Sequence, residues 1–257
     1  VLTRAMLAGL LFLPLLRIRL LPRPVVPGLL VVGALQFGVT YICLYQSFEY
    51  ISVPEVLLFT IFTPLHVALI DDLLNRRFSL GPLVAAAIAV LGAGIMRYDG
   101  LSDSFIRGFL ILQLANFTFA AGQVGYAHLV RRYELTSTQQ WRGFGLFFIG
   151  ALMVMLPAWL LLGNPERLPH TALQWSVLAW LGLVASGLGF LFWNRGAAQV
   201  DAGTLGIMNN ALVPAGLLVN LLIWNHDADL LRLAAGSAVI GLSLWVNARW
   251  SRWFGSR

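Results

Sequence analysis

Long apolar blocks separated by short charged joints constrain the fold of this 257-residue chain more than any other feature. A helix needs about 20 apolar residues to cross the hydrocarbon core of a bilayer. The blocks reach or approach that length, and charged side chains gather between them. We therefore expect an all-α integral membrane protein, a helical bundle with nine transmembrane helices. These are expected at residues 1–16, 28–48, 53–74, 79–97, 105–130, 141–162, 173–194, 200–224 and 230–250.

The composition excludes a soluble globular fold and a secreted disulfide scaffold. Hydrophobic residues make up 59% of the chain and charged residues 11%, whereas soluble domains carry about 25% charged residues. The single cysteine, Cys43, lies within an apolar block and has no partner in the chain for a disulfide. In a membrane protein a net charge of +6 reflects loops held on the cytoplasmic side. We therefore expect no nucleic acid among the partners.

The arginine residues predict how the chain is oriented in the membrane. When the joints are assigned to alternating sides, twelve arginines fall on one side and five, among them Arg4, on the other. Cytoplasmic loops carry the excess of basic residues. We therefore expect a multi-pass protein of the bacterial inner membrane. Its C-terminus, including a tail at residues 251–257, is expected in the cytoplasm.

The two halves of the sequence repeat one another at an offset of 149 to 150 residues. Each half has an aromatic residue near a helix end, Tyr45 in the first half and Trp193 in the second. A short turn follows, and then a helix with a central proline, Pro64 or Pro214. The order and spacing of these features indicate an internal duplication.

The duplication predicts a first repeat at residues 1–97 and a second repeat at residues 105–250. The block at 105–130 has no partner upstream, so we expect a ten-helix protein whose first helix precedes residue 1. Five helices per repeat is an odd number, and the second repeat must enter the membrane with the opposite orientation. Inverted repeats of this kind are typical of secondary transporters, which bind their substrate near the midplane.

This pattern resembles the EamA-type members of the drug/metabolite transporter superfamily. The resemblance rests on the paired five-helix repeats, the mid-helix prolines, and Gly92 and Gly241 at matching positions of the last helices. It covers essentially the whole chain, beginning with the second helix of the family at Arg4. Members of the family move small organic metabolites, often by exporting amino acids or amines. The resemblance therefore implies transport of a small molecule by alternating access.

Polar residues within the apolar blocks predict the substrate site, because a polar group that faces lipid is costly. Helical spacing places amides, hydroxyls and aromatic rings on shared faces. An Asn or Gln in such a position either binds a solute or hydrogen-bonds a neighbouring helix, and both interpretations stay open. The substrate-binding candidates are Gln36, Tyr41, Tyr45, Phe59, Phe62, His66, Asn116, Gln123, Trp193, Asn209 and Asn210.

His66 and Glu55 are the candidates for proton coupling. His66 lies two residues after Pro64. An imidazole titrates near neutral pH, but His66 could instead be neutral and bonded to a carbonyl that the proline frees. Glu55 lies one turn inside its helix, where a carboxylate complements the helix N-terminus. The sequence favours that capping role for Glu55, with proton or amine binding as the alternative.

These features predict a secondary transporter of small amphipathic metabolites of amino-acid or amine type, working as an exporter. The alternative within the class is an importer of a vitamin or nucleoside-like metabolite. From a different class, an intramembrane enzyme or a structural membrane subunit stays open. The arginines are all expected at or near the ends of the apolar blocks, which argues against a phosphorylated substrate.

Signals for an enzyme are weak in this sequence. It has no helix-borne pair of histidines flanking a glutamate and no Ser–His pair at membrane depth. We therefore expect no catalytic residues, no metal and no cofactor. The expected partners are a small-molecule substrate and membrane lipids, and the sequence leaves monomer and dimer open.

Overall fold

The computed structural model describes residues 1–257 except 77, 98–104, 164–168, 213, 216–229 and 255–257. The described part of the chain is helical and contains no strand. Its helices form two compact units. Unit 1 consists of Val1–Cys43 and Ala121–Gln199, and unit 2 consists of Leu44–Ala120 and Val200–Arg257. Each unit therefore combines segments from both halves of the chain.

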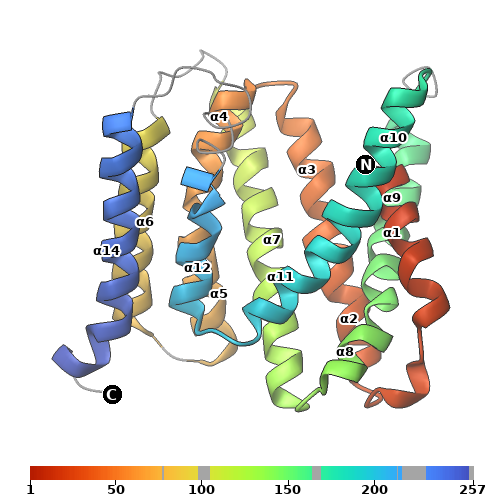
Figure 1. The fold of residues 1–257 in the computed structure, drawn as a ribbon, viewed down its shortest axis with the longest axis horizontal. Coiled ribbons are helices and arrows are strands. Elements are labelled where there is room, and N and C mark those ends of the chain that lie inside the picture. The colour runs from red at the N-terminus through yellow and green to blue at the C-terminus, as the bar shows by residue number, and fades with distance from the viewer. Residues whose placement is uncertain (77, 98–104, 164–168, 213, 216–229, 255–257) are drawn as a thin grey trace. The chain divides into compact units, whose positions relative to one another are not determined.

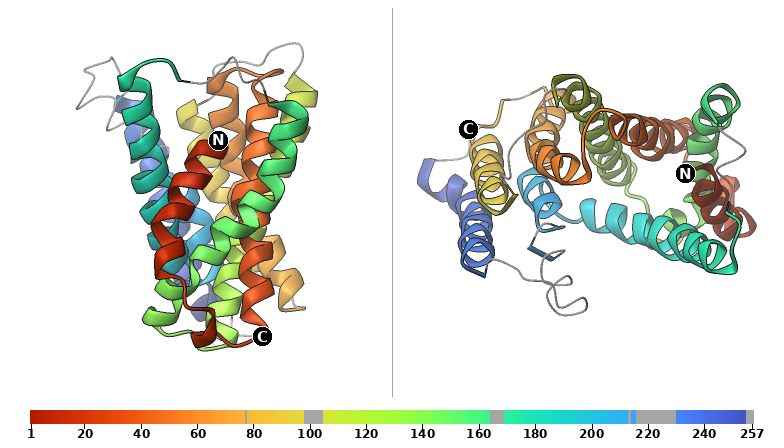
Figure 2. Two further views of the ribbon diagram at one scale, coloured as in Figure 1. Left: turned by 90° about the vertical axis from the view of Figure 1, so that its right-hand side faces the viewer. Right: turned by 90° about the horizontal axis from the view of Figure 1, so that it is seen from above.

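Unit 1 is built around α1 (Leu2–Phe12), which packs against α9 (Gly145–Leu162) and against the π-helical segment η6 (Leu181–Leu188) (Figure 2). Two short 3-10 turns follow α1. The other complete elements of unit 1 are η1 (Leu13–Leu15), η2 (Ile18–Leu20), α2 (Val25–Gly33), the π-helical η3 (Ala34–Val39), α8 (Ser137–Gly143), α10 (Ala172–Trp180) and α11 (Gly189–Ala197). Unit 1 also contains the first half of α3 (Thr40–Ser47) and the end of α7 (Phe105–Arg132).

Unit 2 contains α6 (Leu80–Arg97) and α14 (Leu230–Phe254), which lie side by side (Figure 1). The first residues of these two helices are 150 positions apart, close to the offset of the sequence repeat. The other elements are the end of α3, α4 (Val53–Phe59), the 3-10 turn η4 (Thr60–Phe62), α5 (Thr63–Leu74), the first part of α7 and α12 (Ala202–Asn210).

The predicted fold class is confirmed, because helices occupy all nine expected blocks in the described part of the chain. The block at 200–224 is described only as far as residue 215, and α14 ends at Phe254 rather than at 250. The number of spans and the two inverted repeats stay predictions. Five described stretches are both long and apolar enough to cross a membrane: Val25–Ser47, Glu55–Leu74, Phe105–Arg132, Ser137–Leu161 and Ala172–Ala197.

Capping boxes determine where two helices begin. The Thr136 hydroxyl accepts a hydrogen bond from the N–H of Gln139, whose side chain accepts one from the N–H of Thr136. Thr171 and Gln174 make the same reciprocal pair at the start of α10. Each box satisfies two backbone donors that the first turn of a helix leaves without a partner. These two capping boxes therefore determine where α8 and α10 begin.

Glycines bring α2 and α9 into backbone contact. A Cβ atom at Gly33 would lie 1.8 Å from the carbonyl oxygen of Phe147, and one at Gly150 would lie 1.9 Å from that of Leu30. Neither position has room for a larger residue. Small residues allow membrane helices to approach this closely.

Two long helices of unit 1 contain π-helical segments at matching positions of the expected repeats. The segments η3 and η6 end at Val39 and Leu188, which are 149 positions apart. The hydroxyl of Thr40 donates to the carbonyl of Leu35 within η3 at 2.9 Å, and the N–H of Thr40 donates to the same carbonyl. Short π-helical segments are rare and occur frequently at functional sites. The apolar pattern of the sequence did not predict them.

Candidate functional site

The structure divides the expected substrate residues between the two units, so each group is described within its own unit. Unit 1 holds four of them: Gln36, Tyr41, Gln123 and Trp193. Unit 2 holds the other seven: Tyr45, Phe59, Phe62, His66, Asn116, Asn209 and Asn210.

The helix that carries Pro64 is interrupted in its middle. α4 ends at Phe59, the 3-10 turn η4 follows, and α5 begins at Thr63. Pro64 has no N–H to donate to the carbonyl of Thr60. The hydroxyl of Thr63 donates to that carbonyl instead, at 2.7 Å. Such an interruption leaves backbone carbonyls within an apolar helix that need donors from elsewhere.

Amide side chains from two other helices supply those donors. Asn116 and Gln113 of α7 donate to the carbonyl of Phe59, at 2.9 Å and 3.2 Å. At the end of α12, Asn210 donates to the carbonyl of Ile61 at 3.0 Å. The structure thus brings Asn116 and Asn210 to one helix interruption, where they stabilise the backbone. Their roles in substrate binding stay predictions.

Aromatic rings surround the same interruption. Phe59 and Phe62 both pack edge-on against Phe109 of α7, with ring centroids 5.0 Å and 5.9 Å apart. Edge-to-face pairs at these distances add stability beyond the apolar area that they bury. The two expected aromatic residues therefore belong to one cluster.

His66 bonds a backbone carbonyl at the interruption. Its Nδ1 lies 3.2 Å from the carbonyl oxygen of Phe62, and its ring meets Phe117 edge-on. A carbonyl oxygen only accepts, so this contact assigns the imidazole proton to Nδ1. One of the two interpretations left open by the sequence was a bond to the carbonyl freed by Pro64, which belongs to Thr60. The structure pairs Thr60 with Thr63 and gives His66 the neighbouring carbonyl.

Glu55 makes the contacts of a capping residue. Its Oε2 accepts hydrogen bonds from the N–H of Ser52 at 2.8 Å and from the Ser52 hydroxyl at 2.7 Å. Ser52 immediately precedes α4, so the carboxylate satisfies a donor at the start of that helix. These are the contacts of the capping interpretation that the sequence favoured.

Tyr45 and Asn209, the two remaining candidates of unit 2, have local contacts. The Tyr45 side chain is 49% exposed, and its ring meets Phe48 edge-on. Asn209 donates to the carbonyl of Leu205 in its own helix at 2.9 Å. Unlike its neighbour Asn210, Asn209 therefore directs its amide to the backbone of α12.

Gln123 and Trp193 of unit 1 bind one another. The indole N–H of Trp193 donates to Oε1 of Gln123 at 3.0 Å, and the Gln123 side chain is fully buried. These residues lie on α7 and α11, so the hydrogen bond joins two helices that are distant in sequence. The sequence identified both residues but not their pairing.

Gln36 is buried, and its side-chain amide makes no hydrogen bond to any residue that the structure describes. It lies in η3 against Gly122, where an added Cβ would come within 2.1 Å of the Gln36 Cβ. Leaving a buried polar group unsatisfied costs about 1–3 kcal/mol. A ligand that both donates and accepts hydrogen bonds would satisfy this amide.

The sequence places Arg4 near the end of the block at 1–16, and the structure gives its side chain partners on two other helices. Its Nε donates to the hydroxyl of Ser186 at 3.0 Å, and its Nη2 donates to the hydroxyl of Tyr41 at 3.3 Å. Ser186 is fully buried near the middle of the span Ala172–Ala197. Because α1 packs against η6, the first turn of α1 is level with the middle of that neighbouring span. The guanidinium therefore lies beside the middle of a helix that is long and apolar enough to cross a membrane.

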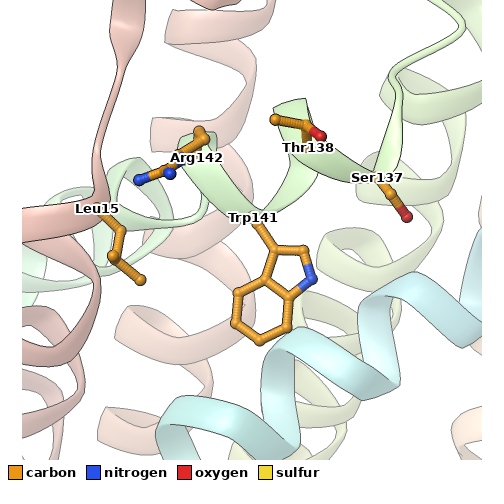
Figure 3. Close-up of a pocket in the computed structure, with 5 residues that line it drawn as sticks. All are labelled: Leu15, Ser137, Thr138, Trp141 and Arg142. Atoms are coloured by element: carbon orange, nitrogen blue, oxygen red, sulfur yellow. The ribbon is translucent and has the colours of Figure 1, made fainter.

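A hollow of about 320 Å³ lies beside α8, lined by Leu15, Ser137, Thr138, Trp141 and Arg142 (Figure 3). Arg195 places its guanidinium 5.8 Å from the ring centroid of Trp141. No expected substrate residue lines this hollow. Among the described residues, no group of three His, Cys, Asp or Glu side chains could hold a metal ion.

An interrupted apolar helix with polar side chains on its carbonyls, together with an arginine beside the middle of an apolar span, is typical of solute transporters. The fold and the site thus define a multi-pass membrane transporter. The profile of the EamA-like transporter family matches residues 1–98, and named transporters align with nearly the whole chain. The chain belongs to the EamA-like transporter family.

Several named relatives are similar along almost their full length. The chain is 64% identical over 247 residues to the probable biotin transporter of Pseudomonas aeruginosa, covering 96% of this chain and 86% of that protein. It is 49% identical over 251 residues to the biotin transporters of Escherichia coli K12 and Salmonella typhimurium, covering 97% of this chain and 83% of each relative. A crystal structure matches with a TM-score of 0.75 at 18% identity, over 98% of this chain and 87% of the other, and shows the fold alone.

These comparisons decide the class of protein. The chain is a membrane transporter of a small molecule and not an enzyme. The relatives that align with almost the whole chain are named transporters, and the matching family is a transporter family. The names of the relatives give no support to efflux of amino acids or amines. They fit the alternative, a vitamin importer, better.

Proposed function

We propose that this protein imports biotin, or a vitamin of closely related structure, across the bacterial inner membrane. The observation that carries the proposal is 64% identity, over 96% of the chain, to a protein named as a probable biotin transporter. The 49% identity to further biotin transporters supports the same substrate class. This proposal replaces amino-acid or amine export, which the sequence alone favoured.

The chemistry of the candidate residues suits such a substrate. Biotin combines a cyclic urea, which donates and accepts hydrogen bonds, with an apolar chain and one carboxylate. The amide of Gln36, which has no partner within the described part of the chain, offers one group of each kind to a urea. Aromatic candidates such as Tyr41 and Trp193 suit the apolar part.

Alternating access between two inverted repeats is the transport mechanism that we propose. Three features at the repeat offset support it. The segments η3 and η6 match in position, α6 packs against α14, and Asn210 contacts Ile61 149 positions away. Secondary transporters with inverted repeats bind their substrate near the midplane, where interrupted helices meet.

Uptake of radiolabelled biotin tests the proposal. The host is a bacterial strain that lacks both biotin synthesis and its own biotin transporter. We expect the expressed protein to restore growth on trace biotin and to accumulate label that excess unlabelled biotin displaces. Amino acids and amines are the matched competitors and should leave uptake unchanged. Membrane-inserted protein that gives no uptake above the empty vector would contradict the proposal, and resistance to toxic amine analogues would restore the export hypothesis.

A further inference from the structure

We propose that Arg4, together with the hydroxyls of Tyr41 and Ser186, binds the carboxylate of the transported solute. The inference rests on the proposed function, because it assigns one end of that substrate to side chains of unit 1. It predicts that the carrier selects for a free carboxylate rather than for the fused rings alone.

Hydrogen bonds to Ser186 and Tyr41 hold the guanidinium of Arg4 in place and leave some of its N–H donors available for a ligand. Arginine has five N–H donors. Two of them contact Ser186 and Tyr41, and the guanidinium carbon lies 5.1 Å from the Tyr41 ring centroid. The Ser186 hydroxyl accepts from Arg4 and keeps its own hydrogen for another acceptor. An arginine fork with a hydroxyl beside it is well suited to a carboxylate, which accepts several hydrogen bonds.

Unit 1 has an excess of positive charge, which favours the binding of an anion beside Arg4. Unit 1 contains nine arginines but only two acidic residues, Glu134 and Glu166. Glu134 lies in the joint between α7 and α8, and Glu166 lies outside the described residues. In the described part of the chain, Arg4 makes no ion pair. A charged side chain at membrane depth is costly and is retained where it serves a substrate or ion. A substrate carboxylate would supply the missing negative charge.

Aromatic rings packed around Tyr41 strengthen the hydrogen bonds that the Arg4 guanidinium can make to an anion. Tyr41 packs against Phe37 with ring centroids 4.5 Å apart, and Phe37 packs against Phe190 at 5.0 Å. Tyr41 and Phe190 also approach one another, at 6.3 Å. Charge-assisted hydrogen bonds are stronger in such a low-dielectric environment than in water. The same rings offer an apolar surface to a hydrocarbon chain next to the carboxylate.

Competition between biotin and biotin amide tests this inference. The amide keeps the rings and the chain but replaces the carboxylate by a neutral group. For the wild-type protein we expect biotin to compete for labelled uptake about 10–100-fold better than the amide, as hydrogen bonds to charged groups predict. Arg4→Gln should raise the KM for biotin by a similar factor and abolish the preference. Arg19→Gln is the matched control, because Arg19 is exposed in η2 and its loss removes the same charge.

Two variants that change less than Arg4→Gln allow the inference to be tested even if Arg4→Gln does not fold. Ser186→Ala and Tyr41→Phe each remove one hydroxyl and should reduce the preference for biotin by about 3–10-fold. Uptake without a preference for the carboxylate would overturn the inference and leave the proposed function standing. A preference that survives in folded Arg4→Gln, or that is undiminished in both hydroxyl variants, would also overturn it. Absence of biotin uptake by the wild-type protein would overturn the proposed function and the inference together.

Discussion

The side-chain amide of Asn210 donates a hydrogen bond to the carbonyl oxygen of Ile61 at 3.0 Å, and the two residues are 149 positions apart. That separation equals the offset at which the two halves of the sequence repeat. Equivalent residues of two repeats come into contact only near the axis that relates them. The contact is therefore consistent with the proposed two-fold relation between the repeats. Gly206 packs against Pro64 in the same place, where a Cβ would lie 3.2 Å from the proline Cα.

Asn210→Ala should destabilise the protein by about 1 kcal/mol, because it leaves the buried carbonyl of Ile61 without this donor. Thermal unfolding of the detergent-solubilised protein measures the change. Asn209→Ala is the matched control, since that amide bonds the backbone of its own helix. Equal loss of stability in both variants would contradict the importance of the contact with Ile61.

Glu55→Gln should leave biotin uptake and its pH dependence unchanged, because an amide oxygen still accepts from the N–H of Ser52. Glu55→Ala removes the cap and should lower the free energy of unfolding by about 1 kcal/mol. Uptake assays over a range of pH and thermal unfolding separate the two effects. If Glu55→Gln stopped accumulation driven by a pH gradient but kept solute exchange, Glu55 would be a proton site rather than a cap.

His66→Gln should abolish accumulation driven by a pH gradient while leaving solute exchange in proteoliposomes largely intact. Glutamine still donates to the carbonyl of Phe62 but does not titrate near neutral pH. Both activities are measured on the same vesicles. Retention of both, or their loss together with folding, would mean that His66 only packs at the interruption.

Asp201→Asn should lower stability at neutral pH, and the difference from the wild type should shrink as the pH falls below the ordinary pKa of an aspartate toward the lower pKa of the folded state. Asp201 precedes α12 at the membrane boundary. Burial alone would raise the pKa of its carboxyl, but hydrogen bonds from Asn247 and Thr204 outweigh burial and hold the pKa below 3.8. A lowered pKa stabilises the folded state above the unfolded-state value and loses that effect at lower pH. A pH-independent difference in unfolding would contradict this role.

Labelling of introduced cysteines tests the orientation predicted from the arginines. In a Cys43→Ser background, His170→Cys should react with an impermeant maleimide from outside the cell. Arg252→Cys should react only after permeabilisation. His170 is exposed in its joint, whereas a Cβ at Gly163 in the same joint would come within 2.3 Å of the Trp159 carbonyl. Reaction of position 252 from outside would reverse the predicted topology.

Features that depend on neighbours along the chain could be predicted from the sequence. The apolar blocks predicted the helices, because a bilayer accepts only segments that satisfy their own backbone hydrogen bonds. Pro64 indicated where its helix frees a carbonyl, since proline removes a backbone donor. The spacing between Ser52 and Glu55 suits a capping carboxylate for the same local reason. The sequence also showed that Asn116 and Asn210 lie within apolar blocks and must find polar partners.

Which partners those amides find was decided only by the tertiary structure. Helical spacing places Asn116 and Asn210 on helix faces, but it does not determine that both meet the helix carrying Pro64. The π-helical segments also escaped prediction, because they form where helix packing alters the backbone hydrogen-bond register. Arg4 is the clearest example of a residue whose partners the sequence did not predict. Its position in the first turn of a block indicates a membrane surface, and only the packing of α1 against η6 brings its guanidinium to the buried hydroxyl of Ser186. The chain determines which groups need partners, whereas the depth and identity of the partner depend on which helices become neighbours.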